Sequence, residues 1–266
     1  MGRRKGNRYE VFQVMAQYST NKGSLLNTND TLYEVVMVAG SDGSVGTSAA
    51  PMTVLPNGLS HVNKFGYTGA DVNGTATIWD GNDTTAIYPY PAAGVVSITS
   101  TSGSDAGEAV EVQGLDGDYN EATETINVGS TGTTTFSRVF RARKVDATNV
   151  GTVTINVGGA LAAQILPGNG QTLMAVYTIP AGKTGYLLQF QGSSDKQTAV
   201  QFKLFARELL DGGAFNLKGQ WGVQGGNVVT YDYKVPLVFT EKTDLRVDIT
   251  TGNNCGGGAI FDLILR

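Results

Sequence analysis

Between residues 97 and 144, apolar and polar side chains alternate in several short runs, and this alternation constrains the fold more than any other feature. Val110 and Val112 alternate with polar neighbours. The same period of two returns at Ile126 and Val128. Successive side chains of a strand point to opposite faces of a sheet, so this period indicates half-buried antiparallel strands. Gly, Ser, Asp and Asn fill the breaks, where tight turns are expected.

The C-terminal half of the chain continues the same pattern. Gly-rich and Pro-Ala-Gly turns separate its apolar runs. Short strands that recur about every ten residues are typical of a β-sandwich or a jelly roll. A fixed-period repeat is not visible, which argues against a solenoid or a propeller. The expected strands are residues 150–157, 161–166, 172–179, 184–191, 200–209, 214–223, 228–235, 244–250 and 258–265.

The N-terminal part is less regular. Strands are expected at residues 9–18 and 32–39, and the Gly- and Ser-rich residues 40–50 have the composition of a flexible connector. Two further short strands are expected at residues 75–80 and 85–88. The fold class predicted is therefore all-β, with antiparallel β-sandwich or jelly-roll units and an extended N-terminal arm.

We expect three regions. Residues 1–56 form a basic arm with β-strands, residues 57–148 a first β-sandwich region, and residues 149–266 a C-terminal jelly-roll-like β-sandwich. The chain of 266 residues is long enough to bury a sizeable core.

Composition excludes several classes of protein. A hydrophobic content of 41% excludes a disordered chain, and a net charge of −4 gives no reason to expect nucleic-acid binding. No apolar run reaches membrane-spanning length, and the basic start lacks the apolar core of a signal peptide, so synthesis in a cytosol is expected. Charged residues make up only 16% of the chain, which suits a surface that neighbouring proteins largely cover.

The first eight residues carry four positive charges, at Arg3, Arg4, Lys5 and Arg8. A frayed, solvated terminus is one interpretation. The other is an arm that docks on an acidic partner surface.

The histidine, the cysteine and the acidic turns of the chain do not form recognisable metal or disulfide sites. His61 is the only histidine and Cys255 the only cysteine, so neither a histidine-based zinc site nor an intramolecular disulfide is expected. Cys255 is expected to be a small buried filler. Residues 116–120 have the oxygen spacing at which a calcium loop begins, but Glu121 and Asn127 stand where an EF-hand needs Gly and Glu. A turn is therefore favoured there and also at residues 80–83, with a weak calcium site shared with a neighbouring subunit as the alternative. No cofactor is expected.

Carboxylates and aromatic residues raise two carbohydrate hypotheses. A hydrolase would need a carboxylate pair, but the candidate glutamates fall in turns or on the solvent side of expected strands, at Glu108, Glu111, Glu121 and Glu124. An aromatic platform for sugar would draw on Trp79, Tyr88, Tyr90 and Trp221, although such residues more often form cores or interface anchors.

Two blocks carry a resemblance to a known family. The run Gly-Leu-Asp-Gly-Asp-Tyr-Asn-Glu-Ala-Thr-Glu-Thr at residues 114–125, followed by Phe-x-Arg-x-x-Arg at 136–141, resembles a family of tailed-bacteriophage virion structural proteins. Residues 149–155 and 171–187 form the second block, and the resemblance covers roughly residues 78–266. It implies a place in a virion, assembled in the host cytoplasm, and brings no catalytic residues.

The function expected is that of a non-enzymatic capsid decoration or cement subunit, which stabilises the shell through contacts with the major capsid protein or other virion proteins. The alternative is a tail, neck or head fibre or appendage that binds host-surface glycan. Self-association is expected, with a trimer favoured by analogy to viral jelly rolls, and no nucleic acid or membrane as a partner. The expected contact residues are Phe215, Trp221, Tyr231 and Tyr233.

Overall fold

The computed structural model describes residues 58–208, 213–224 and 226–266. Two units divide the chain, Met1–Leu59 and Ser60–Arg266, and nearly all described residues belong to the second. The strands expected at 9–18 and 32–39, the connector at 40–50 and the extended arm lie outside the described residues. The same holds for the four basic residues of the arm, Arg3, Arg4, Lys5 and Arg8.

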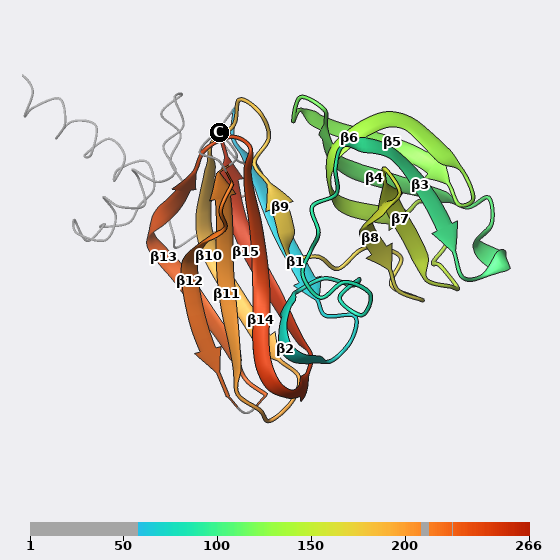
Figure 1. Ribbon diagram of the computed structural model, residues 1–266. Coiled ribbons are helices and arrows are strands. Elements are labelled where there is room, and N and C mark those ends of the chain that lie inside the picture. The colour runs from blue at the N-terminus through green and yellow to red at the C-terminus, as the bar shows by residue number, and fades with distance from the viewer. Residues whose placement is uncertain (1–57, 209–212, 225) are drawn as a thin grey trace, which may run out of the picture. The chain divides into compact units, whose positions relative to one another are not determined.

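Strands account for every regular element of the described residues except one 3₁₀ turn, Gly103–Asp105, so the all-β antiparallel prediction is confirmed. No helix among these residues is long and apolar enough to span a bilayer. The strands, shown in Figure 1, are β1 (Ser60–Tyr67), β2 (Val72–Thr77), β3 (Gly94–Ser100), β4 (Ala109–Asp116), β5 (Glu121–Asn127), β6 (Thr131–Lys144), β7 (Val153–Val157), β8 (Ala160–Ile165), β9 (Val176–Thr178), β10 (Gly185–Ser194), β11 (Val200–Glu208), β12 (Asn216–Val223), β13 (Val228–Phe239), β14 (Thr243–Cys255) and β15 (Gly257–Leu265).

Two sheets form a β-sandwich around one core. The first has the order β1-β15-β10-β13, and the second has the order β12-β11-β14-β2, with β9 paired to β14. Phe190 and Phe261 from the first sheet and Phe202 and Ile249 from the second are fully buried in the same apolar cluster. Alternate residues of β11 are buried, which is the period of two that its sequence predicts.

The third sheet has six strands in the order β5-β4-β6-β3-β7-β8 and packs over its own core. The boundary expected between residues 148 and 149 falls inside this sheet, because β3 pairs with β6 on one side and with β7 on the other. The sandwich, in turn, combines β1 and β2 with the strands from β9 onward. The division into residues 57–148 and 149–266 therefore does not follow the sheets, since long-range pairing joins segments that are distant in sequence.

Local differences from the expected strands have simple causes. Strand β1 was not expected, because its inward positions are filled by Lys64 and Gly66, which hide the apolar period. Residues 85–88 form no strand; the Tyr88 ring there is buried in the core of the six-stranded sheet. The strand expected at 75–80 corresponds to β2, which ends earlier, at Thr77.

The sandwich has two edges that differ in what lies on them. At one edge, called the β1–β9 edge, the six-stranded sheet makes contact through β6: the Phe140 ring lies 4.9 Å from that of Tyr177, and the Lys64 ammonium donates to the Phe140 carbonyl. At the opposite ends of the two strand orders stand β12 and β13, which form the β12–β13 edge.

Candidate partner-binding surface

Exposed apolar side chains gather on the β12–β13 edge. Half of the large apolar residues that are exposed in the described chain lie on these two strands. Apolar groups left in water on terminal strands are typical of surfaces that bind another protein. The exposed fractions are 49% for Leu217, 55% for Val228, 47% for Tyr231, 68% for Val235 and 57% for Val238.

Three of the four contact residues expected from the sequence come together in an aromatic row on this edge. The Trp221 ring stacks on Phe190 with centroids 4.0 Å apart and an interplanar angle of 12°. Tyr231 lies 5.9 Å from Trp221, and Tyr233 lies 4.9 Å from Tyr231. The row thus runs from a core phenylalanine out to the exposed Tyr231. Rigid aromatic rings anchored in this way are the residues that protein interfaces favour.

Strand β13 carries an irregularity that begins at Tyr233, the last residue of the row. Leu187 of β10 pairs with Leu237 and Gln189 pairs with Asp232, so residues 233–236 of β13 face the single residue Leu188. This bulge contains Val235, the most exposed of the large apolar residues. The Tyr233 hydroxyl is buried and makes no hydrogen bond with any described residue, and burial raises the pKa of Tyr233 to about 12.

Phe215, the fourth expected contact residue, lies in a different environment. Its ring is 5.2 Å from that of Tyr90. The guanidinium groups of Arg207 and Arg246 lie 4.6 and 4.2 Å from its centroid. Cations over an aromatic face are held by the ring quadrupole. Phe215 therefore packs within the molecule, in an arginine cluster that the sequence did not reveal.

A buried carboxylate, Asp244 on β14, organises this cluster. Its side chain is fully buried. Arg138 of β6 donates from Nε to Oδ1 at 2.8 Å and from Nη2 to Oδ2 at 3.1 Å. Arg207 of β11 donates to Oδ2 from Nε at 3.0 Å and from Nη2 at 2.5 Å. The Thr178 hydroxyl adds a bond of 2.6 Å to Oδ1. The carboxylate thereby joins the six-stranded sheet to the sandwich.

Electrostatics explains why this arrangement tolerates burial. Burial acts against the charge of Arg138, but its hydrogen bonds to Asp244 raise the pKa of the guanidinium. The Tyr90 ring lies beneath both arginines, 5.4 Å from Arg138 and 4.8 Å from Arg207. Burial raises the pKa of Tyr90 well above its ordinary value, so its hydroxyl stays neutral. Arg138 belongs to the Phe-x-Arg-x-x-Arg block, but nothing in the sequence indicates its distant partner.

A second pair of buried ionisable groups lies near the same contact. Burial lowers the pKa of Lys64 to about 7. Burial also raises the pKa of Asp80 to about 8, although two hydrogen bonds of 2.9 Å from the Leu173 amide act in the opposite direction. Both side chains hold the chain in place by bonding to the backbone, and neither is part of a described cluster suited to a metal ion.

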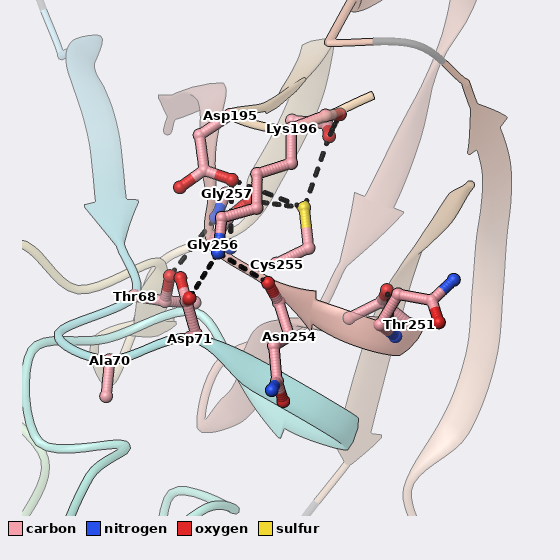
Figure 2. Close-up of polar contacts among 12 residues, drawn as sticks. Thr68, Ala70, Asp71, Asp195, Lys196, Thr251, Asn254, Cys255, Gly256 and Gly257 are labelled. Atoms are coloured by element: carbon pink, nitrogen blue, oxygen red, sulfur yellow. Dashed lines mark hydrogen bonds and ion pairs between the residues drawn. The ribbon is translucent and has the colours of Figure 1, made fainter. Parts of the chain in front are cut away.

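Cys255 lies in a network of polar contacts where three loops meet, shown in Figure 2. Its thiol is fully buried and lies 3.3 Å from Oδ1 of Asp195, which also accepts from the Gly256 amide at 3.0 Å. The other Asp195 oxygen accepts from the Tyr67 hydroxyl at 2.9 Å. Lys196 reaches across to Asp71. These contacts hold the loops against one another, and Cys255 fills a buried position as the sequence predicts.

The remaining chemical candidates have structural partners. Asp116 accepts from the amides of Asp118 and Asn120, both at 2.9 Å, which is a turn that uses its own carboxylate. Glu111 pairs with Arg143 at 2.9 Å. The sole histidine, His61, is about half exposed and lies 3.1 Å from Asp262. Within the described ranges no group of acidic, histidine or cysteine side chains is arranged to hold a metal ion.

The aromatic platform suggested by the sequence does not form. Trp79 and Tyr88 are buried in the core of the six-stranded sheet, and Tyr90 lies beneath the arginines. Only Trp221 of that set belongs to the β12–β13 edge.

No family model matches the chain, and a search of curated proteins gives no match. Among solved structures, the chain is similar to a structure of the infectious bursal disease virus Gx strain, at 7% identity with a TM-score of 0.21, over 87% of this chain and 76% of that one. A subviral particle of infectious bursal disease virus VP2 gives 7% identity and a TM-score of 0.20, over 77% of this chain and 71% of that one. TM-scores of this size are too low to support a role.

Proposed function

We propose that the chain is a non-enzymatic structural protein of a bacteriophage virion, and specifically a capsid decoration or cement subunit. Its partners are the major capsid protein or other virion proteins, on particles assembled in the host cytoplasm. The resemblance of residues 114–125 and 136–141 supports the virion context.

The apolar β12–β13 edge is the observation that carries the proposal. Val235 and Val238 leave more than half of their surfaces exposed on a terminal strand. Such a surface is suited to binding protein, because covering it removes apolar area from water. Two of the glutamates considered for a hydrolase have structural partners: Glu111 pairs with Arg143, and Glu124 accepts from the amides of Thr133 and Thr134.

A particle-binding experiment tests this role. Purified full-length chain is added to particles that lack it, and bound chain and the temperature of particle disruption are measured. We expect saturable binding and a higher disruption temperature. Leu217→Ser, at a leucine of β12 that is 49% exposed, should weaken binding, whereas the control Val150→Ser, at a valine 62% exposed near β7, should not. Absence of binding at tens of micromolar would reject the decoration role.

The basic arm is proposed as a second contact with an acidic partner surface. Removal of residues 1–8 deletes Arg3, Arg4, Lys5 and Arg8 and should reduce incorporation into particles without changing the far-ultraviolet circular dichroism spectrum. Unchanged incorporation would assign these residues to a solvated terminus instead.

A fibre or appendage that binds host glycan is the second candidate, because the Trp221, Tyr231 and Tyr233 rings form a row on the surface. Stacking of a sugar ring on such aromatic residues is the chemistry it would use. A glycan array discriminates the two roles: saturable sugar binding that Tyr231→Ala abolishes would favour the appendage and overturn the cement proposal.

A further inference from the structure

The residues of strand β13 follow a similar chemical order on the two sides of its centre. Around Tyr233 as centre, Asp232 stands on one side and Lys234 on the other, and Tyr231 corresponds to Val235. Further out, Val228, the first residue of the strand, corresponds to Val238, the residue before its last one, Phe239. Opposite charges near the centre are thus flanked by apolar residues on both sides.

Exposure follows the same symmetry. Tyr231 and Val235 are 47% and 68% exposed, and Val228 and Val238 are 55% and 57% exposed. Asp232 and Lys234 are both exposed as well. Val229 and Leu237, which also correspond, both pack against the sandwich core. Three exposed residues of the first half, Val228, Tyr231 and Asp232, therefore have exposed counterparts in the second half, whereas the exposed Thr230 corresponds to the partly buried Pro236.

We propose that β13 is the contact strand of a two-fold homodimer, in which a second copy of this chain lies antiparallel with Tyr233 near the axis. A two-fold axis makes residue i of one copy meet residue j of the other, and j meet i. Asp232 of each copy then lies beside Lys234 of the other copy, and Tyr231 beside Val235. A partner of another kind would not require a strand that is complementary to itself, so this symmetry favours a second copy.

The contact is made by side chains rather than by one continuous sheet. Residues 233–236 bulge out of the ladder with β10, and Pro236 has no amide hydrogen to donate. Bulges, proline and lysine on a terminal strand prevent open-ended strand addition. The isologous contact therefore closes with two copies, whereas the analogy to viral jelly rolls predicts three. It does not depend on a role in a virion.

Charge reversal tests the register directly. Self-association of the full chain is measured by sedimentation equilibrium at low salt, where exposed charges are least screened, for wild type, D232K, K234D and the double variant D232K/K234D. Each single reversal places like charges together at both symmetric positions, and we expect the dimer dissociation constant to rise by about tenfold or more. The double variant exchanges the charges and should restore wild-type association. An equimolar mixture of the two single variants should form the mixed dimer.

Two controls keep the result interpretable. Asp232 accepts a hydrogen bond of 2.6 Å from Gln189 within the same chain, so the thermal midpoint of every variant is compared with wild type. V235S tests the apolar contact without changing the charge of the strand and should also weaken association. A wild-type monomer at tens of micromolar, a trimer, or a double variant as weak as the single ones would each overturn the proposal. Failure of particle binding with an intact dimer would instead reject only the decoration role.

Discussion

The two edges of the sandwich are protected in different ways. At the β1–β9 edge, charged and aromatic side chains from β6 meet the sandwich, with Arg138 on Asp244 and Phe140 beside Tyr177. At the β12–β13 edge, apolar side chains such as Val235 remain exposed. A buried ion pair demands that both partners stay in place, whereas an apolar surface accepts any partner of suitable shape. The first edge therefore serves the fold, and the second is available for assembly.

The buried carboxylate of the β1–β9 edge gives the largest expected effect. Asp244→Ala leaves Arg138 and Arg207 without their common partner, and an uncompensated buried charge costs about 3–5 kcal/mol. The free energy of unfolding, measured by urea titration, should fall by that amount. The control is Glu111→Ala, which breaks a partly exposed pair with Arg143 and should cost about 1 kcal/mol or less. Equal losses in the free energy of unfolding would mean that the buried pairs of Asp244 stabilise the protein no more than the partly exposed pair of Glu111.

The dependence of stability on pH should reveal the Lys64 and Asp80 pair at the same edge. The pKa of Lys64 is about 7 against an ordinary 10.5, so the unfolded chain binds more protons and this contribution to stability rises between those pH values. The pKa of Asp80 is about 8 against an ordinary 3.8, so the folded chain holds the extra proton and this contribution falls over that window.

Together the two groups place a minimum of their joint contribution between about pH 7 and pH 8, as follows from the linkage of protonation to folding. Lys64→Met should remove the rise on the alkaline side, and Asp80→Asn should remove the fall on the acid side. Thermal midpoints of both variants and wild type from pH 5 to pH 10 provide the measurement. A Lys64→Met profile parallel to that of wild type above pH 8 would contradict the assignment.

Phe215 and Tyr231 allow one aromatic residue that packs within the molecule to be compared with one on the β12–β13 edge. Phe215→Ala removes the ring that holds Arg207 and Arg246, and we expect a loss of about 1–2 kcal/mol in the free energy of unfolding. Tyr231→Ala removes a ring that is about half exposed and should cost less, with its main effect on self-association. Sedimentation and urea titration of both variants compare the two quantities. A Phe215 variant that lost association but kept its stability would restore Phe215 as a contact residue.

The sequence predicts the strands well where alternation is clear, and poorly where an inward position is not apolar. Val110 and Val112 of β4 are buried as their period indicates, whereas Lys64 on β1 faces inward and hides that strand. Similarly, the aromatic residues of β12 and β13 are recognisable as surface anchors. Asp244 is not recognisable as a site, because Arg138 reaches it from a strand 106 residues away in sequence. The local sequence pattern predicts the period of a strand. Which charged side chains pair with one another depends on the three-dimensional fold.

The smallest expected effect on the free energy of unfolding comes from a substitution on the β12–β13 edge. Val235 is 68% exposed, while Val62 on β1 is partly buried against the sandwich core. Serine at either position removes the same apolar groups. At Val235 the change should alter the free energy of unfolding by about 0.5 kcal/mol or less, as for surface positions generally. At Val62 the lost burial should cost about 1–2 kcal/mol. Self-association should show the reverse order, weakened by Val235→Ser and unchanged by Val62→Ser. If the two valines instead shifted both quantities alike, the edges would not have the separate roles that their exposure indicates.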